Sequence, residues 1–395
     1  MQTRRHDVVV VGGGNAGLSL AARLRRDGCR DVALVDPREV HVYRPLLSYV
    51  AGGQATLAEA SRPQAGLVPR GCRWYRDRVV AVDADRSTVR LADGGDLAYG
   101  DLVLCPGSEV DWDAVPGARA AMATPHAATS YEPDLAERTW PLLAGLRAGT
   151  AVFALSSRHT PCSPVGLKPL FLAADHWRRS GVLPDVRIEL LVEADRLVAE
   201  ARADRRLREA AEELGVRVRT SSVVERVDPQ ARVLRVRTVD GVTEQPYDAF
   251  YLAPPYRAPR WVAGSGLTSP GSDGLVAVDP DTLRHRAHPR VWALGDVAAH
   301  RTLSSGGALR RQVPVVAHNV AAQRLGQPLR RYDGYTVAPV VTSRRRLLLA
   351  EHDRDARPTP TVPWPDLTRP GLATFVVDRY VEPRVYWHLL LRGRV

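Results

Sequence analysis

A buried strand that runs directly into a glycine-rich turn is the feature that most constrains the fold of this chain. Residues 7–11 have the sequence Asp-Val-Val-Val-Val, and residues 12–17 have the sequence Gly-Gly-Gly-Asn-Ala-Gly. An apolar helical stretch follows at 18–24, and a second apolar strand at 32–35 ends at Asp36. Glycines in such a turn let the backbone approach a pyrophosphate at the helix N-terminus. The sequence therefore predicts a βαβ unit that binds a dinucleotide.

Each position of this unit has an expected role. The turn is predicted to contact the cofactor through Gly12, Gly14, Asn15, Ala16 and Gly17. Asp36 lies about 20 residues beyond the turn, where a carboxylate can accept hydrogen bonds from the adenosine ribose. A glycine turn without a ligand is the alternative, but it would require neither the valine strand before the turn nor the acid after it.

The second half of the chain is predicted to form another α/β unit without a matching glycine loop. A strand is expected at 151–155, a helix at 166–179 and a strand at 186–192. Further elements are expected as a helix at 203–214 and as strands at 216–218, 223–227, 232–237 and 248–252. The segment 156–162, after the first strand, has the sequence Ser-Ser-Arg-His-Thr-Pro-Cys. The thiol of Cys162 thus stands where a nicotinamide nucleotide would need glycines, which indicates that electrons arrive through sulfur rather than from NAD(P)H.

The first half contains three further short strands by its pattern, at 79–83, 87–92 and 101–105. A proline-containing stretch, 106–141, is expected to link the two halves.

A Gly-Asp pair ends an apolar strand much later in the chain, where residues 291–296 have the sequence Val-Trp-Ala-Leu-Gly-Asp. In flavoproteins with two dinucleotide-binding domains, such an aspartate accepts hydrogen bonds from the ribityl chain of FAD. Gly295 and Asp296, combined with the turn at 12–17, therefore predict FAD as the cofactor. A helix near 313–325 is expected to point its N-terminus at the flavin ring and to stabilise negative charge there.

Composition excludes some functions. The formal net charge is +11, but Lys168 is the only lysine and the arginines are spread along the whole chain, so we expect no nucleic-acid partner. The four cysteines, Cys29, Cys72, Cys105 and Cys162, have neither CxxC nor zinc-ligand spacing, so no metal is expected. With no signal sequence and no run of about 20 apolar residues, the chain is expected to be cytoplasmic or peripheral on the cytoplasmic face of a membrane.

Residues 161–177 combine a cysteine, a lysine six positions later, an apolar helix and an aromatic residue. Together with several other segments, this stretch resembles the sulfide:quinone oxidoreductase family, in its mitochondrial-type branch, over nearly the whole chain. The other matching segments are 41–45, 50–53, 60–63, 253–255, 295–296, 332–336 and 386–394.

This resemblance implies an α/β fold with two Rossmann-like, three-layer dinucleotide-binding domains and a C-terminal tail domain. It implies an FAD-binding domain made of residues 1–112 and 276–331, a second Rossmann-like domain at 113–275 and a C-terminal domain at 332–395. It also implies that Arg44, Val79 and Gly107 join the residues named above in binding FAD.

The resemblance also implies a chemistry, in which sulfide attacks a disulfide beside the flavin and two electrons pass through flavin C4a to a quinone. Cys162 and Lys168 are then the catalytic residues. A position just before a helix, and a lysine on its first turns, should both lower the pKa of the Cys162 thiol. A buried, inert cysteine is the alternative interpretation.

Two departures from the family pattern put the two-cysteine relay in doubt. The second redox cysteine of the family lies between Thr336 and Pro339, where this chain has Val337 and Ala338. The family usually has a lysine after the Gly-Asp pair, where residues 304–307 here are Ser-Ser-Gly-Gly. Either Cys162 works alone with an external thiol or persulfide, or another cysteine pairs with it, Cys105 being the candidate.

Three functions remain open on the sequence. The first is oxidation of sulfide or a small thiol or persulfide through Cys162, with transfer to quinone or another acceptor. The second is a diverged flavoenzyme acting on another organic substrate, and the third is a non-catalytic flavin redox sensor. Residues 372–395 are apolar and aromatic with interleaved arginines, as in a segment that lies at a membrane surface, although a docked helix or a homodimer contact has the same pattern.

Overall fold

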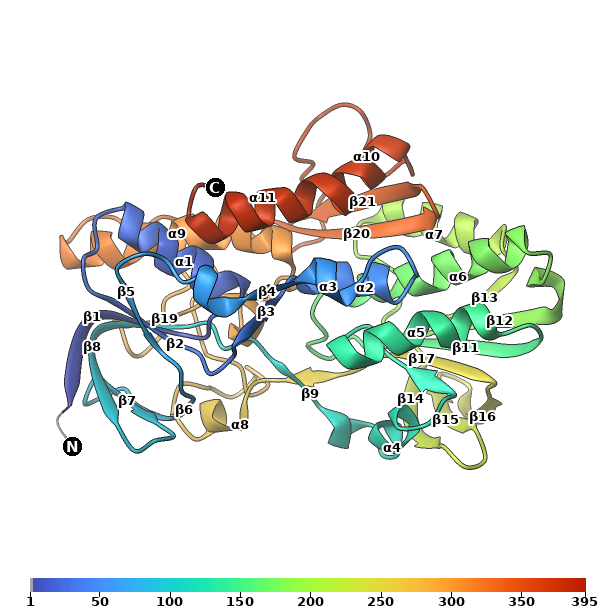
Figure 1. Cartoon of the computed structure of the whole chain (residues 1–395), viewed down its shortest axis with the longest axis horizontal. Coiled ribbons are helices and arrows are strands. Elements are labelled where there is room, and N and C mark those ends of the chain that lie inside the picture. The colour runs from blue at the N-terminus through green and yellow to red at the C-terminus, as the bar shows by residue number, and fades with distance from the viewer. Residues whose placement is uncertain (1–2) are drawn as a thin grey trace.

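Two β-sheets lie side by side along the long axis of the molecule in the computed structural model, which describes residues 3–395 (Figure 1). The first sheet has seven strands in the order β5-β2-β1-β8-β7-β6, with β19 also paired to β8. Its strands are β1 (Arg4–Val11), β2 (Val32–Val35), β5 (Cys72–Tyr75), β6 (Val79–Asp83), β7 (Thr88–Leu91), β8 (Asp96–Leu104) and β19 (Val291–Ala293).

The first sheet is parallel at its centre, where β1 pairs with both β2 and β8. Val8, Val9 and Val10 have no solvent exposure, because helices cover the sheet face and the tail lies beyond them. Continuous apolar runs of this kind are typical of strands that are buried on both faces. The covering helices α1 (Asn15–Arg26) and α9 (Gly306–Arg324) pack against each other.

The second sheet has five parallel strands in the order β10-β17-β11-β12-β13. These strands are β10 (Ala127–Ala128), β11 (Gly149–Leu155), β12 (Val186–Val192), β13 (Val216–Arg219) and β17 (Ala249–Ala253). The helices of this unit are α4 (Ala118–Met122), α5 (Pro133–Gly145), α6 (Leu167–Arg179) and α7 (Ala201–Glu212). An antiparallel sheet of β14 (Val223–Asp228), β15 (Val233–Thr238) and β16 (Gly241–Pro246) lies beside it (Figure 1).

Shorter elements connect the two units. The strands β3 (Val40–Val42) and β4 (Ser61–Pro63) form one antiparallel pair, and β9 (Glu109–Val110) and β18 (Tyr256–Arg257) form another. Between β3 and β4 lie the short helices α2 (Leu47–Val50) and α3 (Leu57–Ala60), and α8 (Arg260–Ala263) follows β18.

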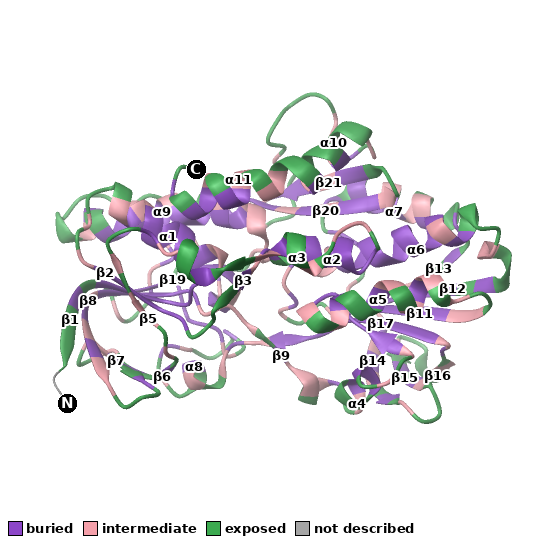
Figure 2. Ribbon diagram, viewed as in Figure 1, coloured by how far each residue is buried: buried purple, intermediate pink, exposed green. Residues whose placement is uncertain are grey.

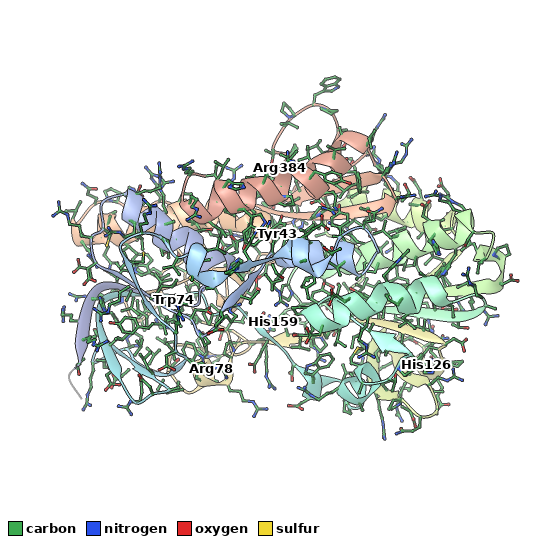
Figure 3. The ribbon with its side chains drawn as sticks, in the orientation of Figure 1. Tyr43, Trp74, Arg78, His126, His159 and Arg384 are labelled. Carbon is green, nitrogen blue, oxygen red and sulfur yellow. The ribbon has the colours of Figure 1, made fainter. Side chains whose placement is uncertain are left out.

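The tail folds back over both units. A hairpin of β20 (Thr336–Ser343) and β21 (Arg346–His352) is followed by α10 (Leu372–Val376), a π-helical turn at Val377–Val381 and α11 (Glu382–His388). This helical run lies along the upper edge of the molecule (Figure 1) and is exposed on its outer side and buried on its inner side (Figure 2). The ring centroids of Tyr43 (labelled in Figure 3) and Tyr386 are 4.2 Å apart, so aromatic packing holds the tail to the first unit.

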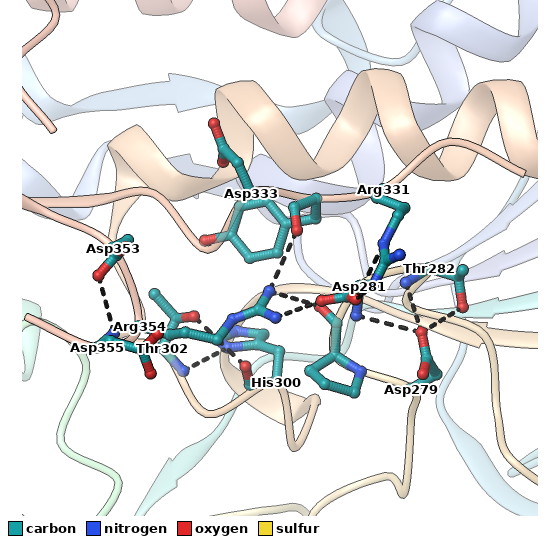
Figure 4. A network of polar contacts seen from close by, with 12 residues as sticks. Asp279, Asp281, Thr282, His300, Thr302, Arg331, Asp333, Asp353, Arg354 and Asp355 are labelled. Atoms are coloured by element: carbon teal, nitrogen blue, oxygen red, sulfur yellow. Dashed lines mark hydrogen bonds and ion pairs between the residues drawn. The ribbon is translucent and has the colours of Figure 1, made fainter. Parts of the chain in front are cut away.

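A polar network also fixes the tail to the segment that precedes β19 (Figure 4). Arg331 and Arg354 both donate hydrogen bonds to the Asp281 carboxylate. Arg354 also donates to the carbonyl oxygens of Pro280 and Tyr332, at 3.0 and 3.1 Å. The pKa of Asp281 is lowered, because these arginine hydrogen bonds outweigh the effect of its burial. We therefore read this network as structural support for the hairpin.

The chain has an α/β fold with two Rossmann-like units, which confirms the fold predicted from the sequence. The stretch 106–141 links the two units and also contains β9, α4, β10 and the start of α5. Two details of the prediction differ in the structure. The strand β16 has mostly exposed residues and no apolar alternation, which is why it was missed. Helix α9 begins at Gly306 rather than near 313, because the Ser305 hydroxyl caps it by accepting from the Ala308 amide at 3.1 Å, despite the poor helix propensity of its glycines.

The predicted domain ranges 1–112, 113–275, 276–331 and 332–395 stay predictions. Over residues 3–395, no helix combines the length and the apolar character needed to traverse a bilayer.

Candidate functional site

The glycine turn is shaped by close contacts with the protein on one side and is open on the other. A Cβ at Gly12 (φ +100°) would overlap the carbonyl oxygen of Cys105, and a Cβ at Gly17 would overlap the carbonyl oxygen of Gly12. At Gly14, by contrast, the nearest atom to an added Cβ is 3.7 Å away, on Arg38. Gly14 is the N-cap of α1 and has no side chain, so the first amides of α1 are available to an anion.

Asp36 is held as a carboxylate at the end of β2. Its oxygens accept hydrogen bonds from the amide of Gly13 at 2.5 Å and from the guanidinium of Arg38 at 2.6 Å. Burial alone would raise its pKa, but the hydrogen bonds and charge of Arg38 lower the pKa overall. Asp36 therefore remains an ionised hydrogen-bond acceptor beside the turn, as its predicted contact with a ribose requires.

The Gly-Asp pair meets the turn although 278 positions separate Gly17 from Gly295 in the sequence. An added Cβ at Gly295 (φ +75°) would lie 3.6 Å from Cβ of Ala16. An added Cβ at Gly306, the first residue of α9, would lie 3.9 Å from the side chain of Asn15. The N-termini of α1 and α9 thus converge, and both would direct their positive ends at a ligand placed between them.

Asp296 and Arg44 belong to the same region. Burial raises the pKa of Asp296, while the positive charge of Arg44 and a hydrogen bond from Ser304 act in the opposite direction. The Arg44 guanidinium donates hydrogen bonds to the Tyr131 carbonyl at 2.6 Å and to the Tyr256 hydroxyl at 3.0 Å. Arg44 therefore joins the first unit to the second beside Asp296.

The remaining two predicted cofactor residues differ in their surroundings. Gly107 follows β8 with φ +73°, and an added Cβ there would meet no atom within 4 Å, so its outer side is open. Val79 starts β6, is buried and pairs with Leu91. Its contact with the cofactor stays a prediction.

This arrangement fits FAD. Two helix N-termini suit a pyrophosphate, an ionised Asp36 suits a ribose, and Gly107 leaves its backbone open to close approach. Apart from Arg44, which follows β3, the residues that would hold the cofactor lie on strands of the first sheet or in the segments that directly follow them.

Cys162 reaches this region from the second unit. It lies in the loop between β11 and α6 and adopts a left-handed backbone conformation with φ +46°, which is strained for a residue with a side chain. Its carbonyl accepts hydrogen bonds from the Val165 amide at 2.9 Å and from the Tyr131 hydroxyl at 3.4 Å. Its Sγ donates to the carbonyl oxygen of Val337 at 3.7 Å.

Val337 is one of the two residues that replace the second redox cysteine of the family. A Cβ at Gly307 would overlap its Cγ1, so the Val337 side chain packs against the first turn of α9. Cys162 therefore lies beside the position that the resemblance gives to the second redox cysteine, and it faces a carbonyl oxygen there. All four cysteines are free thiols, Cys105 and Cys162 included.

The expectation of a lowered pKa for Cys162 was wrong. Burial raises the pKa of this thiol to about 12, and the lowering effect of Lys168 does not compensate. The reason is that Lys168 is itself paired, with its Nζ 2.7 Å from Oδ2 of Asp378, and the Asp378 charge raises the pKa of Cys162. A short four-residue 3-10 helix at Ser163–Gly166 also separates Cys162 from the N-terminus of α6.

Lys168, Asp378 and Tyr49 form a compact buried group. The Tyr49 hydroxyl donates to Asp378 Oδ2 at 2.6 Å, and the Lys168 ammonium lies 4.2 Å from the centroid of the Tyr49 ring. Lys168 is 1% exposed, and burial together with the negative charge of Asp378 raises the pKa of Tyr49. Sequence reasoning found Lys168 but missed Asp378, which lies 210 positions away on the π-helical turn and has no local motif.

We expect the alkylation of Cys162 by iodoacetamide to become about tenfold faster per pH unit between about pH 7 and 10, without a plateau. A pKa near 12 leaves the thiol protonated over this range, and raising the pH increases the reactive thiolate in proportion. Mass spectrometry of the peptide that carries Cys162 measures the rate. A plateau below about pH 8 would show a lowered pKa and would contradict this prediction.

The segment after β11 has no glycine loop and is held by hydrogen bonds to Glu193. The Ser156 hydroxyl and the Ser157 amide both donate to Glu193 Oε2, at 2.6 and 2.8 Å. The cavity beside this segment measures about 20 Å³, far below the several hundred Å³ of a typical ligand pocket. His159 lies 3.4 Å from Asp273 (His159 is labelled in Figure 3), which favours the surface role expected for it over a role as a base.

Comparison with known families agrees with this architecture. The sequence profile of the family described as pyridine nucleotide-disulphide oxidoreductase matches residues 6–138 and 173–323. The stretch between these ranges contains β11, Cys162 and Lys168, so the thiol lies in one of the parts of the chain that the profile does not match.

Individual relatives are more specific. The chain is 29% identical to a mitochondrial sulfide:quinone oxidoreductase of Mus musculus, over 98% of this chain and 87% of that protein. It is 28% identical to the mitochondrial sulfide:quinone oxidoreductase of Dictyostelium discoideum, over 98% of this chain and 86% of that protein.

Among solved structures, the sulfide:quinone oxidoreductase of Aquifex aeolicus superposes with a TM-score of 0.83 at 17% identity, covering 99% of this chain and 92% of that one. At this identity the likeness supports the fold. With the family profile covering most of its length, the chain belongs to the pyridine nucleotide-disulphide oxidoreductase family of FAD-binding oxidoreductases.

Proposed function

We propose that this chain oxidises sulfide, or a small thiol or persulfide, through Cys162 and passes the electrons by way of FAD to a quinone. The observation that carries the proposal is the contact of Cys162 Sγ with the Val337 carbonyl, beside the first turn of α9. That turn is also next to Asn15 of the cofactor-binding unit. The relatives named as sulfide:quinone oxidoreductases match the chain over nearly its whole length and support the same activity.

The proposed step joins the Cys162 sulfur to the sulfur of sulfide. Forming this S–S bond removes one hydrogen from each thiol, which amounts to two electrons and two protons, and leaves a persulfide on Cys162. When bound, FAD would supply the acceptor for the two electrons, and the quinone would take these electrons together with the two protons as a quinol. An external thiol takes the outer sulfur as its own persulfide and returns the proton that restores the Cys162 thiol.

The protein contributes position and protection to this step. The strained left-handed backbone at Cys162 is fixed by the hydrogen bonds from Val165 and Tyr131, so the sulfur is held in one place. Burial keeps the resting group as a thiol, because its pKa is raised to about 12. A protonated thiol is less open to oxidation by solvent-borne oxidants than a thiolate.

The Lys168–Asp378 pair sets the local electrostatics in this proposal. The two charges act on the pKa of Cys162 in opposite directions, Lys168 lowering it and Asp378 raising it. We propose that Lys168 is a positioning residue. Its charge lowers the pKa of the Cys162 thiol, and the charge of Asp378 partly cancels this effect.

An anaerobic titration tests the proposed function against its alternatives. We expect sulfide to bleach the flavin of the purified, yellow protein, with added quinone restoring the colour. Bleaching only by another organic reductant would favour a diverged flavoenzyme. A flavin that no substrate turns over would favour a redox sensor.

NADH should reduce the flavin at least about a hundredfold more slowly than sulfide does. The segment 156–157 is hydrogen-bonded to Glu193, and residues 156–162 offer a nicotinamide nucleotide no glycine turn. Stopped-flow absorbance near the flavin maximum measures both rates under the same conditions. Equal or faster reduction by NADH would contradict the assignment of electron entry to Cys162.

Membrane contact is part of the same proposal. We propose that residues 372–395 contact a membrane from one side, as a quinone acceptor requires. A homodimer and a cytoplasmic location stay predictions.

A further inference from the structure

A cavity of about 760 Å³ lies on the tail side of the second unit, apart from Cys162 and the glycine turn. Its walls come from the segment after α2, the C-terminal half of α6, the turn of the β20–β21 hairpin and the run from α10 into the π-helical turn. Its volume falls in the range of sites that hold a ligand of several tens of atoms.

The charges around this cavity are unbalanced. Arg179, Arg344 and Arg345 line it, are exposed and form no ion pair with any residue of 3–395. The two acidic residues that line the cavity are already in ion pairs. Asp175 lies 2.5 Å from Arg178, and Glu59 lies 3.1 Å from Arg379. Three guanidinium groups are thus left to attract an anion, and guanidinium groups bind phosphate oxygens well.

An apolar ridge borders the cavity. Phe375 and Tyr380 line the cavity from α10 and the π-helical turn. On the same run Leu372 is 58% exposed and Tyr380 is 52% exposed, and the other exposed apolar residues are Val376, Val377 and Val381. The ridge faces outward along the upper edge of the molecule (Figure 2).

Two further residues extend this surface. Trp364, in the segment between β21 and α10, is 84% exposed, and tryptophan is enriched at membrane interfaces. Arg384 lies on the outer side of α11 (Figure 3) and has no ion-pair partner in the described part of the chain. Apolar groups flanked by unpaired arginines are the pattern of a surface that lies in the headgroup zone of a bilayer.

We infer that the cavity is a binding site for the phosphate headgroup of an anionic phospholipid, whose acyl chains extend along the ridge of 372–381. Three unpaired arginines and an adjoining apolar ridge match the two halves of one such molecule. This inference rests on the proposed function in one respect, namely that residues 372–395 contact a membrane. It adds that a specific anionic lipid binds there.

Vesicle flotation of the FAD-loaded protein tests the inference. One variant carries Arg179→Glu, Arg344→Glu and Arg345→Glu, and a matched control carries the same change at three exposed, unpaired arginines elsewhere, namely Arg26, Arg187 and Arg205. Both variants lower the net charge equally. The vesicles contain phosphatidylcholine alone or phosphatidylcholine with phosphatidylglycerol.

We expect the cavity variant to bind the phosphatidylglycerol vesicles at least about tenfold more weakly than the wild type, and the control variant within about threefold of it. On phosphatidylcholine alone, all three proteins should bind equally. Equal losses in the two variants would show a diffuse charge effect, and no loss in either would show that the cavity does not hold the headgroup. Either result overturns the inference.

A second arm separates a lipid from a soluble anion. Inorganic phosphate at about 10 mM, compared with chloride of the same ionic strength, should leave vesicle binding unchanged within about twofold. Displacement by phosphate alone would assign the cavity to a soluble phosphate and would overturn the lipid assignment. Bleaching of the flavin by sulfide, measured without vesicles, should be the same in both variants, so failure of the lipid site and failure of the proposed function give different results.

Discussion

Replacing Cys162 with alanine should lower the rate of flavin reduction by sulfide at least about a thousandfold. In the proposed step the Cys162 sulfur becomes one end of the new S–S bond, and an alanine methyl group offers no sulfur to the substrate. FAD content should not change, because Cys162 lies in the second unit while the cofactor residues lie in the first sheet. Anaerobic stopped-flow absorbance, with sulfide in excess, measures the rate.

The control for this prediction is Cys105→Ala. Cys105 is a free, buried thiol beside Gly12, and the proposed step forms no bond to its sulfur. The Cys105 variant should keep the wild-type rate within about twofold. A loss as large as that of the Cys162 variant would revive the pairing of the two cysteines, and a Cys162 variant with full activity would refute the proposed function.

Replacing Lys168 with methionine should lower the free energy of unfolding by about 3 kcal/mol. The change leaves the Asp378 carboxylate with the Tyr49 hydroxyl but without its positive partner, in a place where its side chain is 14% exposed. Burying an unpaired charge is costly, whereas a charge pair replaced on both sides is tolerated. The double variant Lys168→Met with Asp378→Leu should therefore regain most of the loss. Urea denaturation of the FAD-loaded proteins measures these differences.

An exposed ion pair provides the comparison. Arg90 and Asp96 lie 3.2 Å apart with side chains that are 63% and 35% exposed, so Arg90→Met should cost less than about 1 kcal/mol. The Lys168 variant should also raise the pKa of Cys162 further, since Lys168 lowers it, and should slow alkylation of this thiol at a given pH. A Lys168 variant as stable as the Arg90 variant would show that the buried pair does not stabilise the fold.

The cofactor side of the site could be predicted from the sequence because its signals are local. The strand at 7–11, the turn at 12–17 and the helix after it are contiguous, so their spacing alone describes the geometry. Gly295 and Asp296 lie far away in the sequence, but a strand that ends in Gly-Asp is itself a local pattern. Their approach to Ala16 then follows from placing β19 beside β8 in one sheet.

The thiol side could be predicted only in part. The position of Cys162 near Val337 follows from the family resemblance, but its pKa depends on burial and on a charge 216 positions away, at Asp378. No spacing rule connects a lysine on α6 with an aspartate on a π-helical turn near the end of the chain. Burial is the largest cause of the raised pKa of Cys162 and is a property of the packed structure, which is why a sequence argument based on Lys168 and the start of a helix gave the wrong sign.

Because Cys162 faces the carbonyl oxygen of Val337 rather than a second cysteine, the protein can store fewer reducing equivalents. A cysteine pair at this place would hold two of them in addition to those of the flavin, and Val337 removes that reservoir. The flavin is then the whole store, so both equivalents must leave before the next substrate can react. Reduction of the flavin by the sulfur substrate and its reoxidation by the acceptor must therefore alternate strictly. Without acceptor, the enzyme would stop after reducing its flavin once.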